Sequence, residues 1–378
     1  MKIAFCNRPS WNSPLGGDGV QMLSTKQCLE ELYGVEVNII TSPDQLSKEF
    51  DIVHIFNFAT FEITERFFEK AKQLGIPIAA STIYWDYSYG CTYVIRRVLG
   101  YPSCLTEGQL KFDKFLLKLL YFFNKPVHTS FLFRKKINKF VELSDILLPN
   151  SEEEANHMLY FAGLSNSKKA RKKIHIVYNG VKTERPTTSS ISKDEFLKKY
   201  SIPDHYILQV GRIEYVKNPI NLVYALMDNK EIPIVFVGKP VDELYFKKLK
   251  ELSEKRGNVF FINGVPHEEI SLFYKYADLH ILLSLRESPG LVTLEAAQEN
   301  CPIVVTSERF CPVKTYFPNC PYVVNPLDID DIKNTVLTAY IEKKKTTIDF
   351  EKLSWEYAAK QTYEGYMKII NKQNLQDD

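Results

Sequence analysis

The amino-acid sequence predicts an α/β protein of two doubly wound domains, each built on a parallel sheet covered by helices. The 378 residues, 45% of them hydrophobic and 25% charged, are enough for two domains with buried cores. Short apolar segments alternate with longer amphipathic ones along the chain, which is typical of βαβ units. A polar stretch rich in Pro, Ser and Thr interrupts this alternation at residues 183–200, where we expect the linker.

The first domain is expected to span residues 1–182. Its predicted strands are "KIAFC", "VEVNIIT", "DIVHIFN" and "IPIAAST", followed later by "DILLPNS" and "KIHIVYNG". Between the early strands, "QMLSTKQCLEELY" and "ITERFFEKAKQLG" have apolar residues at helical spacing. A helix between successive strands predicts parallel pairing, because parallel strands need a crossover connection.

The second domain is expected to span residues 201–354, and residues 355–378 to form a helix that packs back toward the first domain. Its predicted strands are "YILQVG", "IPIVFVG", "NVFFING", "LHILLSL", "CPIVVTS" and "PYVVN". Sheets of this kind bind ligands at the carboxyl ends of their strands, near helix N-termini. We therefore expect the two domains to face a cleft and look for the chemistry in the loops that follow the strands.

Composition excludes several classes of protein. Seven scattered cysteines without a CxxC pair argue against a disulfide framework and against a zinc site, and they favour a reducing compartment. The first apolar run is too short for a signal peptide, and no stretch has the roughly 18 apolar residues of a membrane span. We expect a cytoplasmic protein.

The segment "RESPGLVTLE", residues 286–295, follows the predicted strand "LHILLSL" and has a carboxylate near each end. Ser288 can cap a helix and Pro289 suits a first helical turn, so we expect a helix that begins just after Glu287. Glu287 then lies on the loop, and Glu295 lies about two turns inside the helix.

The start of this helix predicts an anion site. The N–H groups around Gly290 and Leu291 have no carbonyl partner in a preceding turn, and the helix dipole favours negative charge there. The absent side chain of Gly290 lets a phosphate come close. A buried Glu295 needs a hydrogen-bond donor, and sugar hydroxyls are good donors. The arrangement suits a nucleotide diphosphate with a glutamate on either side of it.

A second loop points to the same ligand. In "VGRIEYVKN", Arg212 and Lys217 follow Gly211 at the end of a predicted strand. Two cations there would stabilise the charge that develops on a departing pyrophosphate. The alternative is ordinary, because most cations at strand ends are solvated surface charges.

With their spacing, "VGRIEYVKN" and "SLRESPGLVTLEAAQENCPIVVT" resemble the Arg/Lys and Glu-x7-Glu motifs of the retaining GT-B glycosyltransferases that use nucleotide sugars, the glycosyl transferases group 1. Other segments resemble the family's glycine-rich first loop, the end of its first domain and its terminal helix: "PLGGDGVQMLSTKQCL", "LLPNSEEEANHM", "IVYNGV" and "SWEYAAKQTYEGYMKII". The resemblance covers nearly the whole chain and implies a GT-B fold.

The resemblance also implies roles for residues of this chain. Arg212 and Lys217 would hold the diphosphate, Glu287 the donor sugar and Glu295 the ribose. The backbone N–H groups from Gly290 to Val292 would hold the phosphates. The implied catalytic residues are Arg212, Lys217 and Glu287. The donor-binding set is Gly16, Gly17, Gly211, Arg212, Lys217, Glu287, Ser288, Pro289, Gly290, Leu291, Val292 and Glu295.

In the first domain, Gly16 and Gly17 form either a simple turn or a place where the backbone approaches a ligand, although the pattern is no GxGxxG. His54 in "DIVHIF" is more typical of a buried structural histidine than of a catalyst.

The family often has a histidine where this chain has Tyr84, Trp85 and Asp86, and this departure leaves the acceptor side open. The two aromatic residues are either core or a stacking platform for a sugar. Asp86 is a base, a cap or neither. We keep all three as candidates for the acceptor side, since loops often carry function.

Residues 96–139 hold ten Lys/Arg against two acids, interleaved with aromatic residues, and "KKARKK" at 168–173 adds five cations. Such a segment either lies against anionic lipid or forms helices with solvated lysines over an aromatic core. The chain has no nucleic-acid recognition module and its pI is only about 8.0, so we expect no nucleic-acid partner.

These observations predict a retaining glycosyltransferase that moves a sugar from a nucleotide-diphosphate sugar to a glycan or lipid-linked acceptor in polysaccharide assembly, peripheral to the inner face of the membrane. We expect no cofactor and no metal, because Arg212, Lys217 and the helix start supply positive charge. Two alternatives stay open. One is a GT-B epimerase acting on the nucleotide sugar, and the other is a non-catalytic nucleotide- or glycan-binding module.

Overall fold

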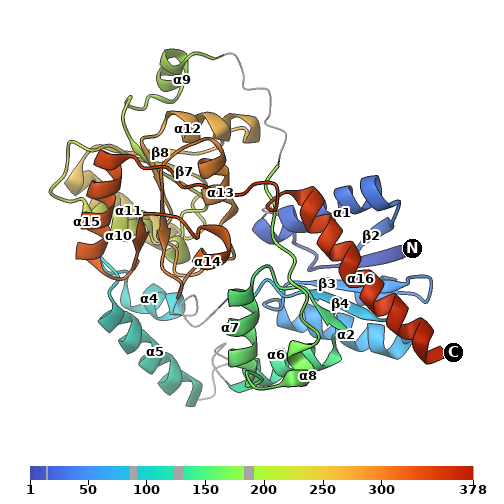
Figure 1. Ribbon diagram of the computed structural model, residues 1–378. Coiled ribbons are helices and arrows are strands. Elements are labelled where there is room, and N and C mark those ends of the chain that lie inside the picture. The colour runs from blue at the N-terminus through green and yellow to red at the C-terminus, as the bar shows by residue number, and fades with distance from the viewer. Residues whose placement is uncertain (14–15, 86–91, 123–130, 183–190, 378) are drawn as a thin grey trace. The chain divides into compact units, whose positions relative to one another are not determined.

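The structure is a computed structural model that describes residues 1–13, 16–85, 92–122, 131–182 and 191–377. The chain divides into two compact units, each with its own sheet (Figure 1). The first unit comprises Met1–Asp86, Ser130–Thr183 and Asp349–Asp378, and the second comprises Tyr87–Thr129 and Glu184–Ile348. None of the helices in the described part of the chain is long and apolar enough to cross a membrane.

The sheet of the first unit has five parallel strands in the order β2-β1-β3-β4-β5. Its strands are β1 (Lys2–Cys6), β2 (Glu36–Ile40), β3 (Ile52–Phe56), β4 (Ile78–Ser81) and β5 (Ile146–Leu147). Nearly every residue of the central strands is buried, as expected for parallel strands covered by helices. The strand order reverses between β1 and β3, which is where such sheets bind ligands.

The helices of the first unit form two packed groups. One group pairs α1 with the terminal helix α16, and the other joins α2, α6 and α7. Their bounds are α1 (Gly17–Tyr33), α2 (Phe61–Leu74), α6 (Phe131–Leu143), α7 (Glu152–Ala162), α8 (Lys168–Arg171) and α16 (Trp355–Asp377), with a short 3-10 turn η1 at Pro43–Gln45. Tyr33 and Tyr363 stack at 4.3 Å between ring centres where α16 lies on α1.

The sheet of the second unit has six parallel strands in the order β11-β10-β9-β6-β7-β8. Its strands are β6 (Ile207–Val210), β7 (Ile234–Val237), β8 (Val259–Ile262), β9 (Leu279–Ile281), β10 (Ile303–Thr306) and β11 (Val323–Val324). Read from β8, the order is that of the dinucleotide-binding fold, third-second-first-fourth-fifth-sixth, and it reverses between β6 and β9. The predicted fold class of two doubly wound α/β domains is confirmed.

The second unit contains the larger set of helices. They are α4 (Tyr93–Leu99), α5 (Glu107–Phe122), α9 (Lys193–Tyr200), α10 (Pro219–Ala225), α11 (Glu243–Arg256), α12 (Ile270–Tyr276), α13 (Leu291–Gln298), α14 (Val313–Tyr316) and α15 (Ile329–Glu342), with 3-10 turns η2 (Tyr215–Lys217) and η3 (His267–Glu269). Helix α9 lies inside the expected linker, and its Phe196 is buried against Phe273. The structured part of the second unit therefore begins before residue 201.

The chain also crosses from one unit to the other in a way that the sequence does not predict. Residues 87–129, expected in the first domain, group with the second unit. Tyr101, Leu105 and Leu110 belong to the buried core of that unit. The Tyr101 hydroxyl donates to Asp242 at 2.7 Å, and the Leu105 N–H donates to the Asn221 side chain at 2.7 Å. This segment has the same helical spacing of apolar residues whichever unit it packs on. Hydrophobic periodicity alone therefore cannot assign it to a unit.

Candidate active site

The two sequence motifs follow neighbouring strands of the second sheet. The loop with Arg212 and Lys217 follows β6, and the loop with Glu287 follows β9, which pairs with β6 in parallel. Parallel neighbours end at the same edge of the sheet, so both loops lie at the point where the strand order reverses. The Leu285 N–H donates to the Val216 carbonyl at 2.8 Å and ties one loop to the other.

Lys217 and Glu287 form an ion pair at this point. The Lys217 ammonium donates to Glu287 Oε1, and the two side chains are only 18% and 10% exposed. The carbonyl of Lys217 accepts from the Gln209 side chain at 3.1 Å, which holds the end of η2 against β6. The structure thus brings together a cation and a carboxylate that lie seventy positions apart in the chain.

Glu287 sits in a tightly built loop. Its N–H donates to the Phe310 carbonyl at 2.8 Å. Gly290 has φ +89°, a conformation that side chains rarely adopt, and a Cβ added there would lie 3.4 Å from Glu287 Oε2. The positive φ therefore favours glycine for the turn into α13, whereas the added Cβ would make only an ordinary contact with the Glu287 carboxylate.

Helix α13 begins later than the sequence predicts. It starts at Leu291 after Gly290, with no side-chain cap, so the predicted roles of Ser288 as cap and Pro289 as first-turn residue are wrong. The left-handed conformation of Gly290 delays the first helical turn by these two residues. Glu295 therefore lies in the second turn of α13, and the first N–H groups of the helix belong to Leu291 and Val292.

Glu295 has a hydrogen-bond donor within the protein. The hydroxyl of Tyr274 in α12 donates to Glu295 Oε2 at 3.0 Å. Burial raises the pKa of Tyr274 well above its usual value, so this hydroxyl remains a donor at any physiological pH. The expectation of a buried Glu295 that depends on ligand hydroxyls is corrected, because Glu295 is half-buried and Tyr274 orients it. No motif spacing in the sequence indicates Tyr274.

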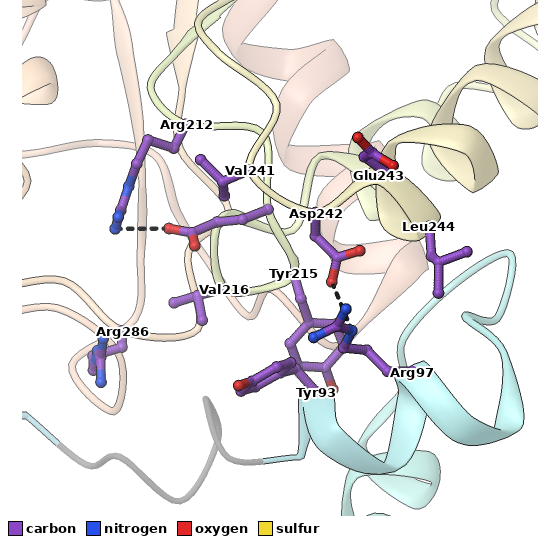
Figure 2. A pocket seen from close by; sticks show the side chains of 11 residues that line it. Tyr93, Arg97, Arg212, Tyr215, Val216, Val241, Asp242, Glu243, Leu244 and Arg286 are labelled. Carbon is purple, nitrogen blue, oxygen red and sulfur yellow. Dashed lines mark ion pairs between the residues drawn. The ribbon is translucent and has the colours of Figure 1, made fainter. Parts of the chain in front are cut away.

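A pocket of about 780 Å³ adjoins these loops within the second unit (Figure 2). It is lined by the loops after β6, β7 and β9 and by α4. The lining residues are Tyr93, Arg97, Arg212, Glu214, Tyr215, Val216, Val241, Asp242, Glu243, Leu244 and Arg286. The sequence does not predict Tyr93 and Arg97 at this site, because their segment lies within the expected first domain. The lining combines three guanidinium groups, three carboxylates and two tyrosine rings, and such a mixture of polar groups and flat apolar surface suits a sugar.

Arg212 and Lys217 have different surroundings although both follow β6. Arg212 lines the pocket, is 50% exposed and pairs with Glu214 at 2.9 Å (Figure 2). Lys217 is mostly buried and pairs with Glu287. The backbone is tight just before them, since a Cβ at Gly238 would lie 1.9 Å from the Gly211 carbonyl oxygen. Arg212 is therefore accessible from the pocket, whereas Lys217 is held by its ion pair with Glu287.

The backbone geometry at Gly16 and Gly17 of the first unit does not require glycine as that at Gly290 does. Gly16 precedes α1 with an ordinary φ of −108°, and a Cβ added at Gly17 would meet nothing within 4 Å. A polar cluster that was not predicted lies next to it, at the point where the first sheet reverses its strand order. Arg8 pairs with Asp18, and the Asn57 side chain donates to Asp18 at 3.3 Å.

The aromatic candidates of the first unit lie in its core. Tyr84 and Trp85 are each 1% exposed and pack near Phe161 and His157, which favours the core alternative over a stacking platform. Asp86 lies outside the described residues.

His54 is also buried, as predicted. Its ring nitrogens bond Ser81 at 2.9 Å and Tyr366 at 2.5 Å, and burial lowers its pKa to about 3, so it stays neutral.

Residues 192–348 match the family described as glycosyl transferases group 1, which confirms the predicted resemblance for the second unit. A similar curated protein is the alpha-monoglucosyldiacylglycerol synthase of Streptococcus pneumoniae, 26% identical over 212 residues, which are 52% of this chain and 47% of that protein. Another is a D-inositol 3-phosphate glycosyltransferase of Catenulispora acidiphila, 27% identical over 184 residues, which are 44% of this chain and 42% of that protein. These matches span about half the length of the relatives.

Solved structures share the fold over nearly the whole chain. HepE from Anabaena in complex with UDP and glucose has a TM-score of 0.64 at 15% identity, with 99% of each chain covered. Sucrose-phosphate synthase from Thermosynechococcus elongatus has a TM-score of 0.68 at 13% identity, covering 98% of this chain and 100% of that one. The fold is GT-B.

Proposed function

We propose that this protein is a retaining glycosyltransferase that transfers a sugar from a nucleotide-diphosphate sugar. The observation that carries the proposal is the ion pair of Lys217 and Glu287, built where the second sheet reverses its strand order. A donor of this kind has an anionic diphosphate joined to a polyhydroxylated sugar. Lys217 supplies a cation for the diphosphate, and Glu287 supplies a carboxylate for the sugar. Their direct contact matches the junction of diphosphate and sugar, where the bond breaks during transfer.

Different residues of the second unit bind different parts of the donor. Lys217 stabilises the charge that develops on the leaving phosphate, and Arg212 reaches the diphosphate from the pocket. Glu287 accepts hydrogen bonds from the sugar. The first N–H groups of α13 at Leu291 and Val292 receive phosphate oxygens, and Glu295, held by Tyr274, receives the ribose hydroxyls. HepE, which has the same fold, has been crystallised in complex with UDP and glucose.

In the proposed reaction an acceptor hydroxyl attacks the anomeric carbon from the face that the phosphate leaves. The bond from that carbon to the phosphate oxygen breaks as the new bond forms, and the hydroxyl proton passes to the departing phosphate. Positive charge from Lys217, Arg212 and the start of α13 stabilises the leaving group without a metal or other cofactor.

We propose a glycan or lipid-linked acceptor in polysaccharide assembly on the cytoplasmic side of a membrane. One curated relative is named for a glucosyldiacylglycerol product and another for an inositol phosphate, so related chains act on very different acceptors. The described cysteines are free thiols, which fits a reducing compartment.

A ligand panel tests the proposed donor. The intact protein is heated with nucleoside diphosphates, their sugars and the matching monophosphates. A diphosphate at 100 times its dissociation constant should stabilise the fold by about 2.7 kcal/mol, and the monophosphate should stabilise it less because it lacks one phosphate. If no nucleoside diphosphate or nucleotide sugar raises the unfolding temperature, the proposed function is wrong. Incubation with the bound sugar donor alone then separates transfer from epimerisation, because an epimerase changes the donor without an acceptor.

A further inference from the structure

Exposed apolar side chains concentrate on α4 and α5 of the second unit. Val98 is 81% exposed and Phe115 is 57% exposed, values far from those of core residues. The exposed apolar residues of the two helices are Tyr93, Val94, Val98, Leu99, Phe112, Phe115 and Leu119, which are seven of the fifteen large apolar residues exposed in the described chain. Scattered exposed apolar residues are ordinary, but a cluster on two adjoining helices marks a binding surface.

The two helices are held to each other by their other side, and Leu110 of α5 belongs to the buried core of the unit. Leu110, Asp113 and Leu117 lie on one face of α5 and are buried. The Arg96 side chain of α4 donates to both carboxylate oxygens of Asp113, at 2.7 Å and 2.5 Å, and this pair is itself buried. The exposed apolar face is therefore a property of a fixed helix pair, which Figure 1 shows at the edge of the second unit.

Cations accompany the apolar residues. On α5, Lys111, Phe112, Phe115, Lys118 and Leu119 are exposed at the spacing of one helical stripe, opposite the buried face. Both lysines are exposed, and Glu107, one turn before Lys111, pairs with Arg309 at 2.9 Å. Apolar side chains flanked by exposed lysines are the composition with which an amphipathic helix lies in the headgroup region of an anionic bilayer.

We propose that the outward face of α4 and α5 is a membrane-contact surface for bilayers containing anionic lipid. The surface is defined by Val94, Val98, Phe112, Phe115 and Leu119 with Lys111 and Lys118. It narrows the sequence expectation for residues 96–139, because α6 belongs to the first unit and its lysines have protein partners. Lys136 and Lys139 pair with Glu65 at 3.1 Å and 2.8 Å, and Lys139 also pairs with Glu69.

The surface adjoins the pocket through one helix. Tyr93 and Arg97 of α4 line the pocket, while Val94 and Val98 of the same helix belong to the proposed surface. A bilayer in contact with α4 would thus present its headgroups beside the pocket that contains Arg212. Membrane contact does not rest on the proposed reaction, since lipid binding and nucleotide binding are measured separately.

Vesicle sedimentation with the intact protein tests this proposal. Wild type is mixed with vesicles of phosphatidylcholine alone or with added phosphatidylglycerol, at rising salt. It should sediment with the anionic vesicles and detach as salt increases, because screening shortens the Debye length from about 8 Å toward 3 Å. The triple variant Val98→Ser, Phe112→Ser, Phe115→Ser should bind roughly tenfold or more weakly, and Lys111→Gln with Lys118→Gln should lose the preference for anionic lipid.

Matched controls make the result specific. Tyr160→Ser and Ile341→Ser replace apolar residues that are each 78% exposed elsewhere, and Lys247→Gln with Lys255→Gln removes two exposed lysines of α11. These variants should bind vesicles as wild type does, and all variants should keep their unfolding temperature and their response to nucleotide. The proposal is overturned if wild type ignores anionic vesicles at low salt or if the triple variant binds unchanged. It is also overturned if the triple variant abolishes a self-association seen without lipid while vesicle binding is absent, since a second copy then covers the surface.

Discussion

The two sheets each reverse their strand order once, and the two reversal points carry different chemistry. In the second unit the reversal lies between β6 and β9, and Lys217 meets Glu287 there, with Gly290 in a conformation that favours glycine. In the first unit it lies between β1 and β3, next to Arg8, Asp18 and Asn57.

Neither Gly16 nor Gly17 of the first unit has a backbone conformation that requires glycine. A sequence motif indicates a functional site when its residues contact one another and its glycines have backbone conformations that favour glycine. The second unit meets this condition, whereas Gly16 and Gly17 of the first unit do not, although Asp18 beside them pairs with Arg8. The predictions below therefore contrast the two units, from the largest expected effect to the smallest.

Loss of the Lys217 cation should have the largest effect. Lys217→Ala removes the charge nearest the leaving phosphate, and we expect kcat to fall by roughly 10²–10³. Steady-state kinetics with the donor identified by the ligand panel measure this. Lys255→Ala is the control, because that lysine is exposed and lies at the opposite end of α11 from the residues that line the pocket. A folded Lys217→Ala enzyme within threefold of wild type would remove Lys217 from the site.

A pair of glycine substitutions contrasts the units directly. Gly290→Ala forces a side chain into φ +89° beside Glu287, and we expect a loss of about 1–3 kcal/mol of unfolding free energy together with weaker donor binding. Gly17→Ala adds a methyl group to open space in the first turn of α1, where alanine is the better helix former, so stability should stay level or rise by up to about 1 kcal/mol. Chemical denaturation measures both. If both variants lost the same unfolding free energy, the proposed difference between the two loops would be wrong.

Tyr274→Phe should have a smaller and more selective effect. It removes the hydrogen bond that holds Glu295, at a net cost of about 1 kcal/mol, so affinity for the free nucleotide diphosphate should fall several-fold. Calorimetric titration gives this affinity. Tyr200→Phe is the control, because its hydroxyl also donates to a glutamate, at 2.6 Å, but that glutamate, Glu269, is not a proposed donor residue. If both variants bind nucleotide as wild type does, Tyr274 has no part in positioning Glu295.

The smallest effect is expected in the first unit. Asp18→Asn weakens the contacts of Arg8 and Asn57 but leaves every proposed donor residue in place. The affinity for free nucleotide diphosphate should therefore stay within twofold of wild type. The same titration measures it, and a tenfold loss would mean that the first unit takes part in nucleotide binding.

The sequence predicts well what depends on local pattern. Alternating strands and helices give two doubly wound units, and the Arg/Lys and Glu-x7-Glu motifs lie after neighbouring strands because parallel strands end at one edge. Features set by distant contacts were missed. The packing of residues 92–122 on the second unit depends on a core shared with Ile220 and Tyr245, which no periodicity within the segment records.

The same limit applies inside the site. Tyr274 reaches Glu295 from another helix, and Tyr93 and Arg97 reach the pocket from a segment far away in the chain. The sequence predicts too early a start for α13, because residue preference favours Ser288 and Pro289 at the helix start, whereas the backbone conformation of Gly290 determines it.

The most direct test of the central claim is a calorimetric titration of Glu287→Gln and Glu295→Gln with the free nucleotide diphosphate and with its sugar. Glu287 contacts Lys217 and is proposed to meet the sugar, so Glu287→Gln should spare the free nucleotide and impair use of the sugar donor. Glu295 is proposed to meet the ribose, so Glu295→Gln should weaken both ligands, by about 1–3 kcal/mol for a lost charged hydrogen bond. Equal losses for the free nucleotide in the two variants would contradict a site in which the carboxylates lie on opposite sides of the diphosphate.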